Sequence, residues 1–196
     1  MHLKLADIAE IQSGYHFPEG VTFDAQAEYR VIQPKDISPE GKIRPAETPV
    51  HTPKPPHEGH LVKPSDILFI SRLNPRAAYV EKPIPHTIAT SHFFIIRAHG
   101  EKALPAYLAW FLNQKSTQSI VRKVAQGTSI VNVTKKDLMN LDVLLPPKEM
   151  QAKVAKLDQL SRNYKAIHEE LQLTLDKMIE ALTNKAIQKY EKGALL

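Results

Sequence analysis

Proline divides this chain of 196 residues into two unlike parts. All 15 prolines lie at or before Pro147, whereas residues 148–196 contain no proline and a single glycine, Gly193. Because proline lacks a backbone donor and breaks helix interiors, the first part is restricted to short elements joined by loops, while the second part is free to form one long helix. We therefore predict two domains, a body at residues 1–147 and a helical domain at residues 148–196.

The body contains short apolar runs that are bounded by turn residues. The clearest buried strands are residues 66–71 and 92–97, whereas residues 38–60 hold six prolines and two glycines and are expected to form loops or irregular edges. Several short strands, with helices gathered late in the body, predict an α+β fold. The other expected elements are a short helix or strand at 3–11, strands at 29–32, 130–133 and 141–145, helices at 103–113 and 116–124, and a helical turn at 136–139.

From residue 148 to about residue 190, apolar side chains recur at steps of three and four, which is the spacing of a coiled-coil seam. About 40 helical residues span about 60 Å, whereas a body of this size is roughly 30 Å across. The stripe therefore favours pairing with a partner helix, and packing against the chain's own body is the alternative. The seam residues are Leu157, Leu160, Tyr164, Ile167, Leu171, Leu175, Met178 and Leu182.

Composition narrows the functional classes. The chain has no cysteine, which excludes disulfides, thiolate zinc sites and cysteine nucleophiles and indicates a reducing cytoplasm. It has no apolar run of about 18 residues, so we expect neither a membrane span nor a membrane partner. The formal net charge of +5 allows an acidic partner such as nucleic acid, but many proteins are basic without binding one.

The common catalytic signatures are missing, including the phosphate-binding glycine loops and the serine nucleophile elbow. His57 and His60 flank Glu58 at a spacing of three in a loop, whereas zinc-binding helices place two histidines at a spacing of four. Asp36 and Glu40 resemble part of a nuclease set, but a turn with solvated charges explains them better. We therefore predict no catalytic residue, no metal site and no cofactor. A nuclease remains a minor hypothesis that Mg²⁺-dependent cleavage would test.

Two polar loops carry side chains that suit nucleic-acid binding. The first loop, residues 71–76, follows a buried strand and holds Arg72, Asn74 and Arg76. Arginine pairs with guanine O6 and N7, and asparagine pairs with adenine N6 and N7, so this loop is a candidate for reading bases. The alternative is a polar turn with incidental charge.

The second loop, residues 126–136, combines glycine, hydroxyl and lysine side chains that suit phosphate contacts. The helical turn that begins after Thr134 would also offer amide donors to a phosphate, although its lysines alternatively form a solvated helix face. Lys35 and Arg44 add positive charge to the proline-rich region, which alternatively is a mobile surface. The candidate DNA-binding residues of the second loop are Gly127, Thr128, Ser129, Asn132, Lys135 and Lys136.

Several segments, taken in order, resemble the DNA-specificity subunits of type I restriction–modification systems. Residues 144–151, followed by 154–158, resemble the boundary at which a strand ending in two prolines leads into the long conserved helix of that family. Residues 11–17, 29–37 and 65–68 resemble three segments that lie earlier in the family's recognition domain. The resemblance touches nearly the whole chain.

The resemblance implies a target-recognition domain at residues 1–147, attached to a spacer and dimerisation helix at residues 148–196, without catalysis by this chain. Typical subunits of the family carry two such units, whose helices pair antiparallel and dock methyltransferase subunits. This chain resembles half of a subunit, either a natural half-length form or an excised piece. We expect a cytoplasmic homodimer that reads a bipartite double-stranded DNA site and recruits methyltransferase subunits and, through the complex, the restriction subunit. The alternative is a coiled-coil interaction module without direct DNA readout.

Overall fold

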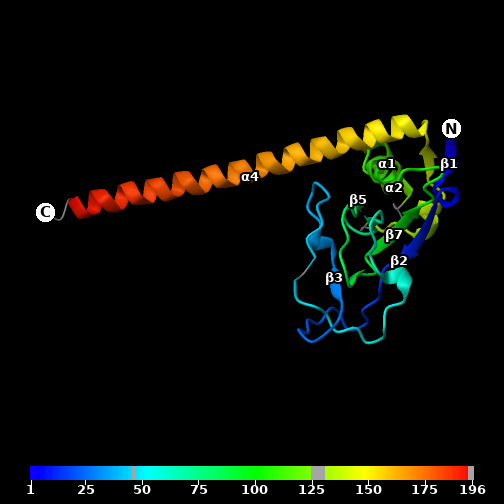
Figure 1. Ribbon diagram of the computed structural model, residues 1–196, viewed down its shortest axis with the longest axis horizontal. Coiled ribbons are helices and arrows are strands. Elements are labelled where there is room, and N and C mark those ends of the chain that lie inside the picture. The colour runs from blue at the N-terminus through cyan, green and yellow to red at the C-terminus, as the bar shows by residue number, and fades with distance from the viewer. Residues whose placement is uncertain (46, 125–130, 194–196) are drawn as a thin grey trace. The chain divides into compact units, whose positions relative to one another are not determined.

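Figure 1 shows a computed structural model of the chain, which describes residues 1–45, 47–124 and 131–193. The chain forms two compact units, residues 1–156 and residues 157–196. The first unit combines short strands and short helices, and the second holds the larger part of one long C-terminal helix. The predicted fold class, α+β with a long C-terminal helix, is confirmed.

The centre of the first unit is a four-stranded antiparallel sheet. Its strands in spatial order are β2 (Ala9–Ser13), β7 (Phe93–Ala98), β4 (Ile67–Ile70) and β5 (Arg76–Tyr79). All four apolar residues of β4 are buried. Ile67 and Phe69 belong to one core cluster, whereas Leu68 and Ile70 belong to a second one. This division follows from the two-residue period of a strand, which sends successive side chains to opposite faces of the sheet.

Two smaller sheets complete the first unit. β1 (His2–Lys4) pairs antiparallel with β8 (Asp142–Leu144), and β3 (Arg30–Ile32) pairs parallel with β6 (Thr87–Ala89). The β1–β8 pair joins the start of the chain to the residues that lead into the last helix. Three short 3₁₀ helices lie in the connections, η1 (Leu5–Asp7), η2 (Pro34–Asp36) and η3 (Glu58–His60).

Three short helices contribute to the first core cluster, α1 (Pro105–Leu112), α2 (Lys115–Val124) and α3 (Lys135–Met139). Helix α1 begins with a proline, at a position where a missing N–H costs no helical hydrogen bond. It buries Tyr107 and Leu108, while α2 buries Val121 and α3 buries Leu138. The helices and the sheet therefore share one apolar core.

A side chain covers part of the open edge of the sheet at β5. Asn113, which follows α1, donates a hydrogen bond from Nδ2 to the carbonyl of Ala77 at 2.8 Å. Its Oδ1 accepts from the N–H of the same residue, also at 2.8 Å. The amide of Asn113 thus takes the place of a neighbouring strand at the centre of β5. Because an unpaired edge strand is a site where another chain can add, this contact protects the edge.

The last helix, α4 (Lys148–Gly193), has 46 residues and is about 69 Å long at about 1.5 Å per residue. Its first turns belong to the first unit, where Gln151 is 1% exposed. Gln151 accepts a hydrogen bond from the N–H of Leu104 at 2.9 Å and donates to the carbonyls of Lys102 at 3.2 Å and Pro146 at 2.9 Å. This buried amide fixes the start of α4 to the segment before α1.

Most expected elements occur within two residues of their predicted bounds, and three expectations differ. Residues 3–11 form parts of β1, η1 and β2, because the chain turns at η1 instead of continuing as one element. In the predicted strand at 130–133, the described residues make one isolated bridge at Asn132. Strands β5 and β6 were not predicted, since both are short and neither contains a run of large apolar side chains. In the part of the chain that the structure describes, no helix is long and apolar enough to cross a membrane.

Candidate nucleic-acid interface

The two polar loops predicted from the sequence lie side by side. The N–H of Leu73 donates to the carbonyl of Val131 at 3.0 Å, and the N–H of Val133 donates to the carbonyl of Ser71 at 2.8 Å. Arg72 and Asn132, which are 60 residues apart in the sequence, face each other in this antiparallel bridge. Backbone hydrogen bonds thus bring the first loop against the described end of the second loop.

The first loop is also anchored to the central sheet. The N–H and the hydroxyl of Ser71 both donate to the carbonyl of His92, each at 2.9 Å. At the other end of the turn Pro75 is buried, and β5 begins at the next residue. Sequence reasoning singled out the charged residues of this loop and missed Ser71, although its position directly after a buried strand marks it as an anchor.

The tip of the first loop is a tight turn whose side chains face solvent. Leu73 has a φ of +63° and is 75% exposed, a conformation that is uncommon for residues other than glycine. The N–H of Asn74 donates to the carbonyl of Arg72 at 2.8 Å and closes the turn. Arg72 and Asn74 are both exposed on it. The loop therefore displays two of the three predicted base-reading side chains.

Arg72 is held by a side chain of the second segment. Its Nε donates to Oδ1 of Asn132 at 3.3 Å, and both side chains are exposed. The bond engages Nε and not the two terminal nitrogens, Nη1 and Nη2, which form the outer edge of the guanidinium group. That edge presents two parallel donors, the pattern that matches O6 and N7 of guanine.

Arg76, the third predicted base reader, has a contact within the fold. It is half-buried in β5, and its Nη2 donates to the carbonyl of Ile37 at 2.8 Å. Ile37 pairs with Ile43 in a small turn of the proline-rich region, where Arg44 donates its N–H to the carbonyl of Asp36 at 2.8 Å. Arg76 therefore ties this turn to the edge of the sheet, and any contact of Arg76 with DNA remains a prediction.

Four further candidates are exposed lysine and arginine residues whose positions the structure gives. Lys35 lies in η2, Arg44 ends the turn held by Arg76, and Lys135 and Lys136 form the start of α3. Their contacts with DNA remain predictions. The candidates Gly127, Thr128 and Ser129 lie outside the residues that the structure describes.

The N-terminal cap of α3 is hydrogen-bonded within the helix, and the expectation that α3 offers amide donors to a phosphate remains a prediction. Thr134 Oγ1 accepts from the N–H of Asp137 at 3.2 Å. The carboxylate of Asp137 in turn accepts from the N–H and the hydroxyl of Thr134 at 2.8 Å and 2.7 Å. These capping bonds use two amide donors, and the negative charge of Asp137 opposes a phosphate at the same place.

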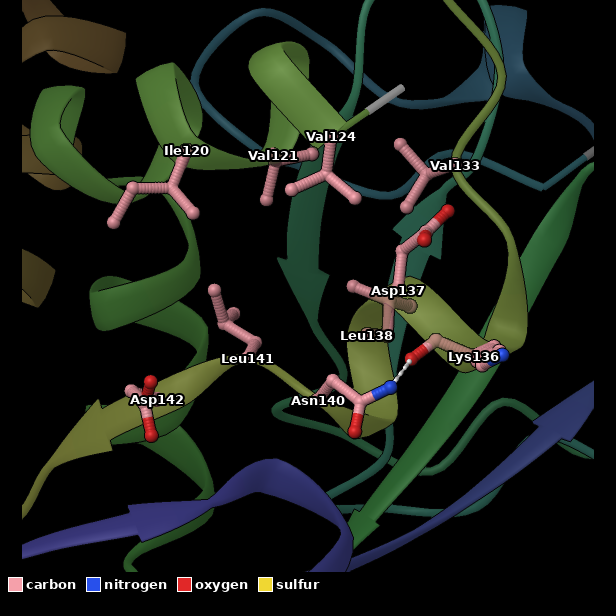
Figure 2. Close-up of a pocket in the computed structure, with 10 residues that line it drawn as sticks. All are labelled: Ile120, Val121, Val124, Val133, Lys136, Asp137, Leu138, Asn140, Leu141 and Asp142. Atoms are coloured by element: carbon pink, nitrogen blue, oxygen red, sulfur yellow. Dashed lines mark hydrogen bonds between the residues drawn. The ribbon is translucent and has the colours of Figure 1, made fainter. Parts of the chain in front are cut away.

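A cavity of about 320 Å³ lies between α2 and α3 (Figure 2). Ile120, Val121 and Val124 line it from α2, and Leu138 and Leu141 from the other side. Lys136 lies at its rim, where its backbone carbonyl accepts a hydrogen bond from Asn140 at 2.9 Å. The cavity is mainly apolar and lies beside the lysine pair of α3, so we assign it no role in base reading.

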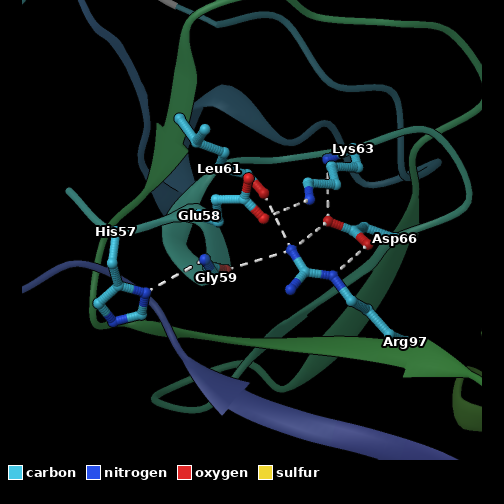
Figure 3. Close-up of polar contacts among 7 residues, drawn as sticks. All are labelled: His57, Glu58, Gly59, Leu61, Lys63, Asp66 and Arg97. Carbon is cyan, nitrogen blue, oxygen red and sulfur yellow. Dashed lines mark hydrogen bonds and ion pairs between the residues drawn. The ribbon is translucent and has the colours of Figure 1, made fainter.

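A partly buried ion pair holds the histidine-containing loop at the end of the proline-rich segment (Figure 3). Arg97 donates to the carboxylate of Asp66 at 2.9 Å and 3.0 Å, and also to the carbonyls of Gly59 and Leu61. The hydrogen bond to Asp66 raises the pKa of Arg97, with added attraction from the charges of Asp66 and Glu10 against opposing desolvation. Sequence reasoning missed this anchor, because the two residues belong to different strand segments.

The same loop holds the two histidines that were considered as metal ligands. The rings of His57 and His60 are in contact, with centroids 3.6 Å apart and planes tilted by 32°, and Nδ1 of His57 accepts a hydrogen bond from the N–H of Gly59 at 3.1 Å. Burial lowers the pKa of His60, and the neighbouring His57 lowers it further. Among the described residues, no group of three or more histidine, aspartate or glutamate side chains is placed to hold a metal ion.

The second unit, residues 157–196, presents the predicted seam. The eight seam side chains are between 47% and 70% exposed. At about 100° per residue they fall on one face of α4, whereas Leu173, which is 56% exposed, falls on the opposite face. This unit therefore shows an uncovered apolar stripe about seven turns long.

Comparison with known proteins places the chain in a family. The model of the type I restriction modification DNA specificity domain matches residues 1–177. The search of curated proteins finds no match.

Three solved structures of 13–20% sequence identity share the fold. The specificity subunit of the M. genitalium type I system is 13% identical, with a TM-score of 0.55 over 80% of this chain and 37% of that one. The HsdS subunit from Thermoanaerobacter tengcongensis is 20% identical, with a TM-score of 0.63 over 85% and 43%. A chain from work on complex assembly and conformational transition of the type I R-M system is 16% identical, with a TM-score of 0.63 over 93% and 43%.

The chain thus spans less than half the length of these three structures. The family model covers both the α+β unit and the first 30 residues of α4, from Lys148 to Lys177. With most of the sequence matched, this chain belongs to the family of type I restriction–modification DNA specificity domains.

Proposed function

We propose that this chain is the DNA-recognition component of a type I restriction–modification assembly. Residues 1–147 act as the target-recognition domain, and residues 148–196 form the spacer helix that joins a second copy of the chain and docks methyltransferase subunits. The restriction subunit is reached through that complex. The observation that carries the proposal is the pairing of residues 71–74 with residues 131–133, which gathers base-reading and phosphate-binding candidates at one place.

The family is the recognition component of these systems and performs no catalytic step. A role on DNA within such a complex supports a cytoplasmic location. The alternative of a coiled-coil module without DNA readout is not favoured, because the matched family reads DNA.

We assign the candidate residues to two roles, reading base edges and binding phosphates. Arg72 and Asn74, displayed on the tight turn, are proposed to read base edges in the major groove. Lys135, Lys136, Lys35 and Arg44, all exposed cations, are proposed to bind phosphates, which position the domain without reading sequence.

Arg72 and Lys135 provide the test of this division. The site is first found by sequencing methylated DNA from a host that carries the system, and binding is then measured with the methyltransferase subunits present. We expect Arg72→Ala and Arg72→Lys to relax base preference by about 1–3 kcal/mol at one position, since lysine keeps the charge but cannot pair bidentately. We expect Lys135→Ala to lower the salt slope by about one without changing the preference. If neither residue altered DNA binding, the proposed reading surface would be wrong.

The seam of α4 is suited to antiparallel pairing with itself. If Leu157 lies opposite Leu182 of a second copy, Tyr164 lies opposite Leu175, because both intervals are seven residues. The remaining seam positions then meet within one residue of each other. The symmetry axis of such a pair falls between residues 169 and 170, close to Ile167. Pairing would cover large apolar side chains that are each worth about 1.5–3 kcal/mol on full burial.

Ile167 and Leu173 form a matched pair for testing the homodimer. Both are more than half exposed, but Ile167 lies on the seam near the proposed axis and Leu173 lies on the opposite face. In sedimentation equilibrium at tens of micromolar without methyltransferase, we expect the unaltered chain and Leu173→Asp to be dimers and Ile167→Asp to be a monomer. A monomeric unaltered chain would overturn the homodimer and favour the alternative in which the stripe packs on its own body.

A further inference from the structure

We infer that Asn132 is the positioning residue that orients Arg72 for guanine, an inference that rests on the proposed DNA-reading function. The two residues face each other in an isolated antiparallel bridge, and Nε of Arg72 donates to Oδ1 of Asn132 at 3.3 Å. The backbone bonds on both sides, between Leu73 and Val131 and between Val133 and Ser71, fix the distance between the two main chains. The backbone of both residues is therefore already fixed, and the side-chain bond determines only the direction of the Arg72 guanidinium group.

The chemistry of the bond suits a guanidinium group that reads a base. Arginine has a long flexible side chain, and fixing it before DNA arrives removes part of the entropy that binding would otherwise cost. Because the bond engages Nε, it leaves the Nη1 and Nη2 edge for the two acceptors of guanine, O6 and N7. Asparagine supplies the acceptor without adding a negative charge, so the attraction of Arg72 to DNA is retained.

The same bond is a poor candidate for holding the loop together. Both side chains are exposed, and hydrogen bonds between exposed groups compete with water and add little to stability. The loop already has its backbone bridge, and Ser71 anchors it to the carbonyl of His92. A substitution at Asn132 is therefore expected to leave the fold intact and to weaken DNA binding.

The experiment is a double-mutant cycle on the complete complex with methyltransferase subunits. The probes are duplexes that carry the mapped site, with each guanine replaced in turn by 7-deazaguanine, which lacks the N7 acceptor. We expect one replacement to weaken binding of the unaltered complex, by less than the roughly 5- to 150-fold of a whole bidentate contact because the O6 acceptor is retained. Asn132→Ala should reduce that sensitivity several-fold, and Arg72→Ala should abolish it.

The decisive comparison is made in the Arg72→Ala background. If Asn132 acts through Arg72, adding Asn132→Ala to Arg72→Ala changes neither affinity nor 7-deazaguanine sensitivity any further. Asn132→Asp keeps an acceptor oxygen at the same place, so it should keep the guanine sensitivity while lowering overall affinity through its charge. Gln26→Ala, at an exposed amide side chain of the first unit outside the candidate site, is the control and should change neither. Thermal unfolding of each variant checks that the fold is retained.

The outcomes separate this inference from the function on which it rests. If Arg72→Ala alters guanine sensitivity but Asn132→Ala does not, or if Asn132→Ala weakens binding equally with and without Arg72, the positioning role is wrong and DNA reading by Arg72 stands. If no guanine responds to replacement and Arg72→Ala leaves binding unchanged, the proposed reading surface fails, and the positioning role fails with it.

Discussion

The two units of the molecule differ in where their side chains find partners. In residues 1–156 the buried polar side chains Gln151 and Asp66 are 1% and 3% exposed, and each is hydrogen-bonded within the unit. In residues 157–196 eight apolar seam side chains are at least 47% exposed. The first part of the sequence therefore builds a core of its own, whereas the second leaves an apolar face exposed, which the proposed association would cover. Changes in the first unit should lower stability at any protein concentration, and changes on the seam should act only through association.

The largest expected loss comes from the ion pair of the first unit. Asp66→Ala leaves Arg97 half-buried without its carboxylate and frees the N–H of Lys63, which donates to Asp66 at 2.9 Å. We expect a loss of about 3–5 kcal/mol of unfolding free energy, measured by denaturation followed through the fluorescence of the single tryptophan, Trp110.

An exposed ion pair of similar length is the matched control. Lys4 and Asp142 lie 2.8 Å apart, but their side chains are 47% and 64% exposed. Asp142→Ala should therefore cost no more than about 1 kcal/mol. Equal losses for the two aspartates would contradict the view that burial decides the value of the pair.

The next largest effect is expected at the start of α4. Gln151→Ala removes one acceptor and two donor contacts and leaves the N–H of Leu104 and two carbonyls without these bonds. We expect a loss of about 2–4 kcal/mol, against no more than about 0.5 kcal/mol for the exposed Gln172→Ala of the same helix. Chemical denaturation of both variants measures the difference. Comparable losses would show that the buried contacts of Gln151 do not stabilise the start of α4.

Dilution tests the second unit directly. Leu175→Ala should weaken association by about 2 kcal/mol per copy, since a large apolar side chain loses its burial, while Leu173→Ala on the opposite face should leave association unchanged. The helical signal in circular dichroism should fall on dilution sooner for Leu175→Ala, because in proteins most helical stability comes from the packing of an apolar face. The fluorescence of Trp110, which reports on the first unit, should not change on dilution. A helical signal independent of concentration in all three proteins would contradict pairing.

The smallest expected effect is a pH dependence of the stability of the first unit. The pKa of His60 is lowered from its usual 6.5 by burial and by His57, so the folded chain binds this proton less readily than the unfolded chain. The contribution of His60 to stability is then fully present above pH 6.5 and is lost as the pH falls through the lowered pKa. His60→Gln should flatten this part of the stability profile between pH 7.5 and 5. An unchanged profile would show that another group is responsible.

Local patterns predicted the elements that have strong local causes. The strand at 66–71 stands out by its unbroken apolar run, and α4 stands out by its seam and by the absence of proline. Strand β5 escaped prediction because two of its four residues are alanines, and only its pairing with β4 makes it a strand.

The candidate site depended on pairing between distant segments, which no local period reveals. The sequence marks Arg72, Arg76 and Asn132 as polar, but it does not tell that Arg72 meets Asn132 or that Arg76 donates to the carbonyl of Ile37. Arg72 and Arg76 are the same residue type and lie four positions apart in the sequence. Their different surroundings follow from one lying on the exposed turn and the other in a strand.

The amide of Asn113 has a consequence for how copies of this protein meet. By occupying both backbone groups of Ala77, it mimics a peptide unit and denies the edge of β5 to an incoming strand at that point. Fibril growth and strand exchange, which start at open sheet edges, are thereby hindered. One side chain thus disfavours association through the sheet edge, which leaves the helix pairing proposed above without this competitor.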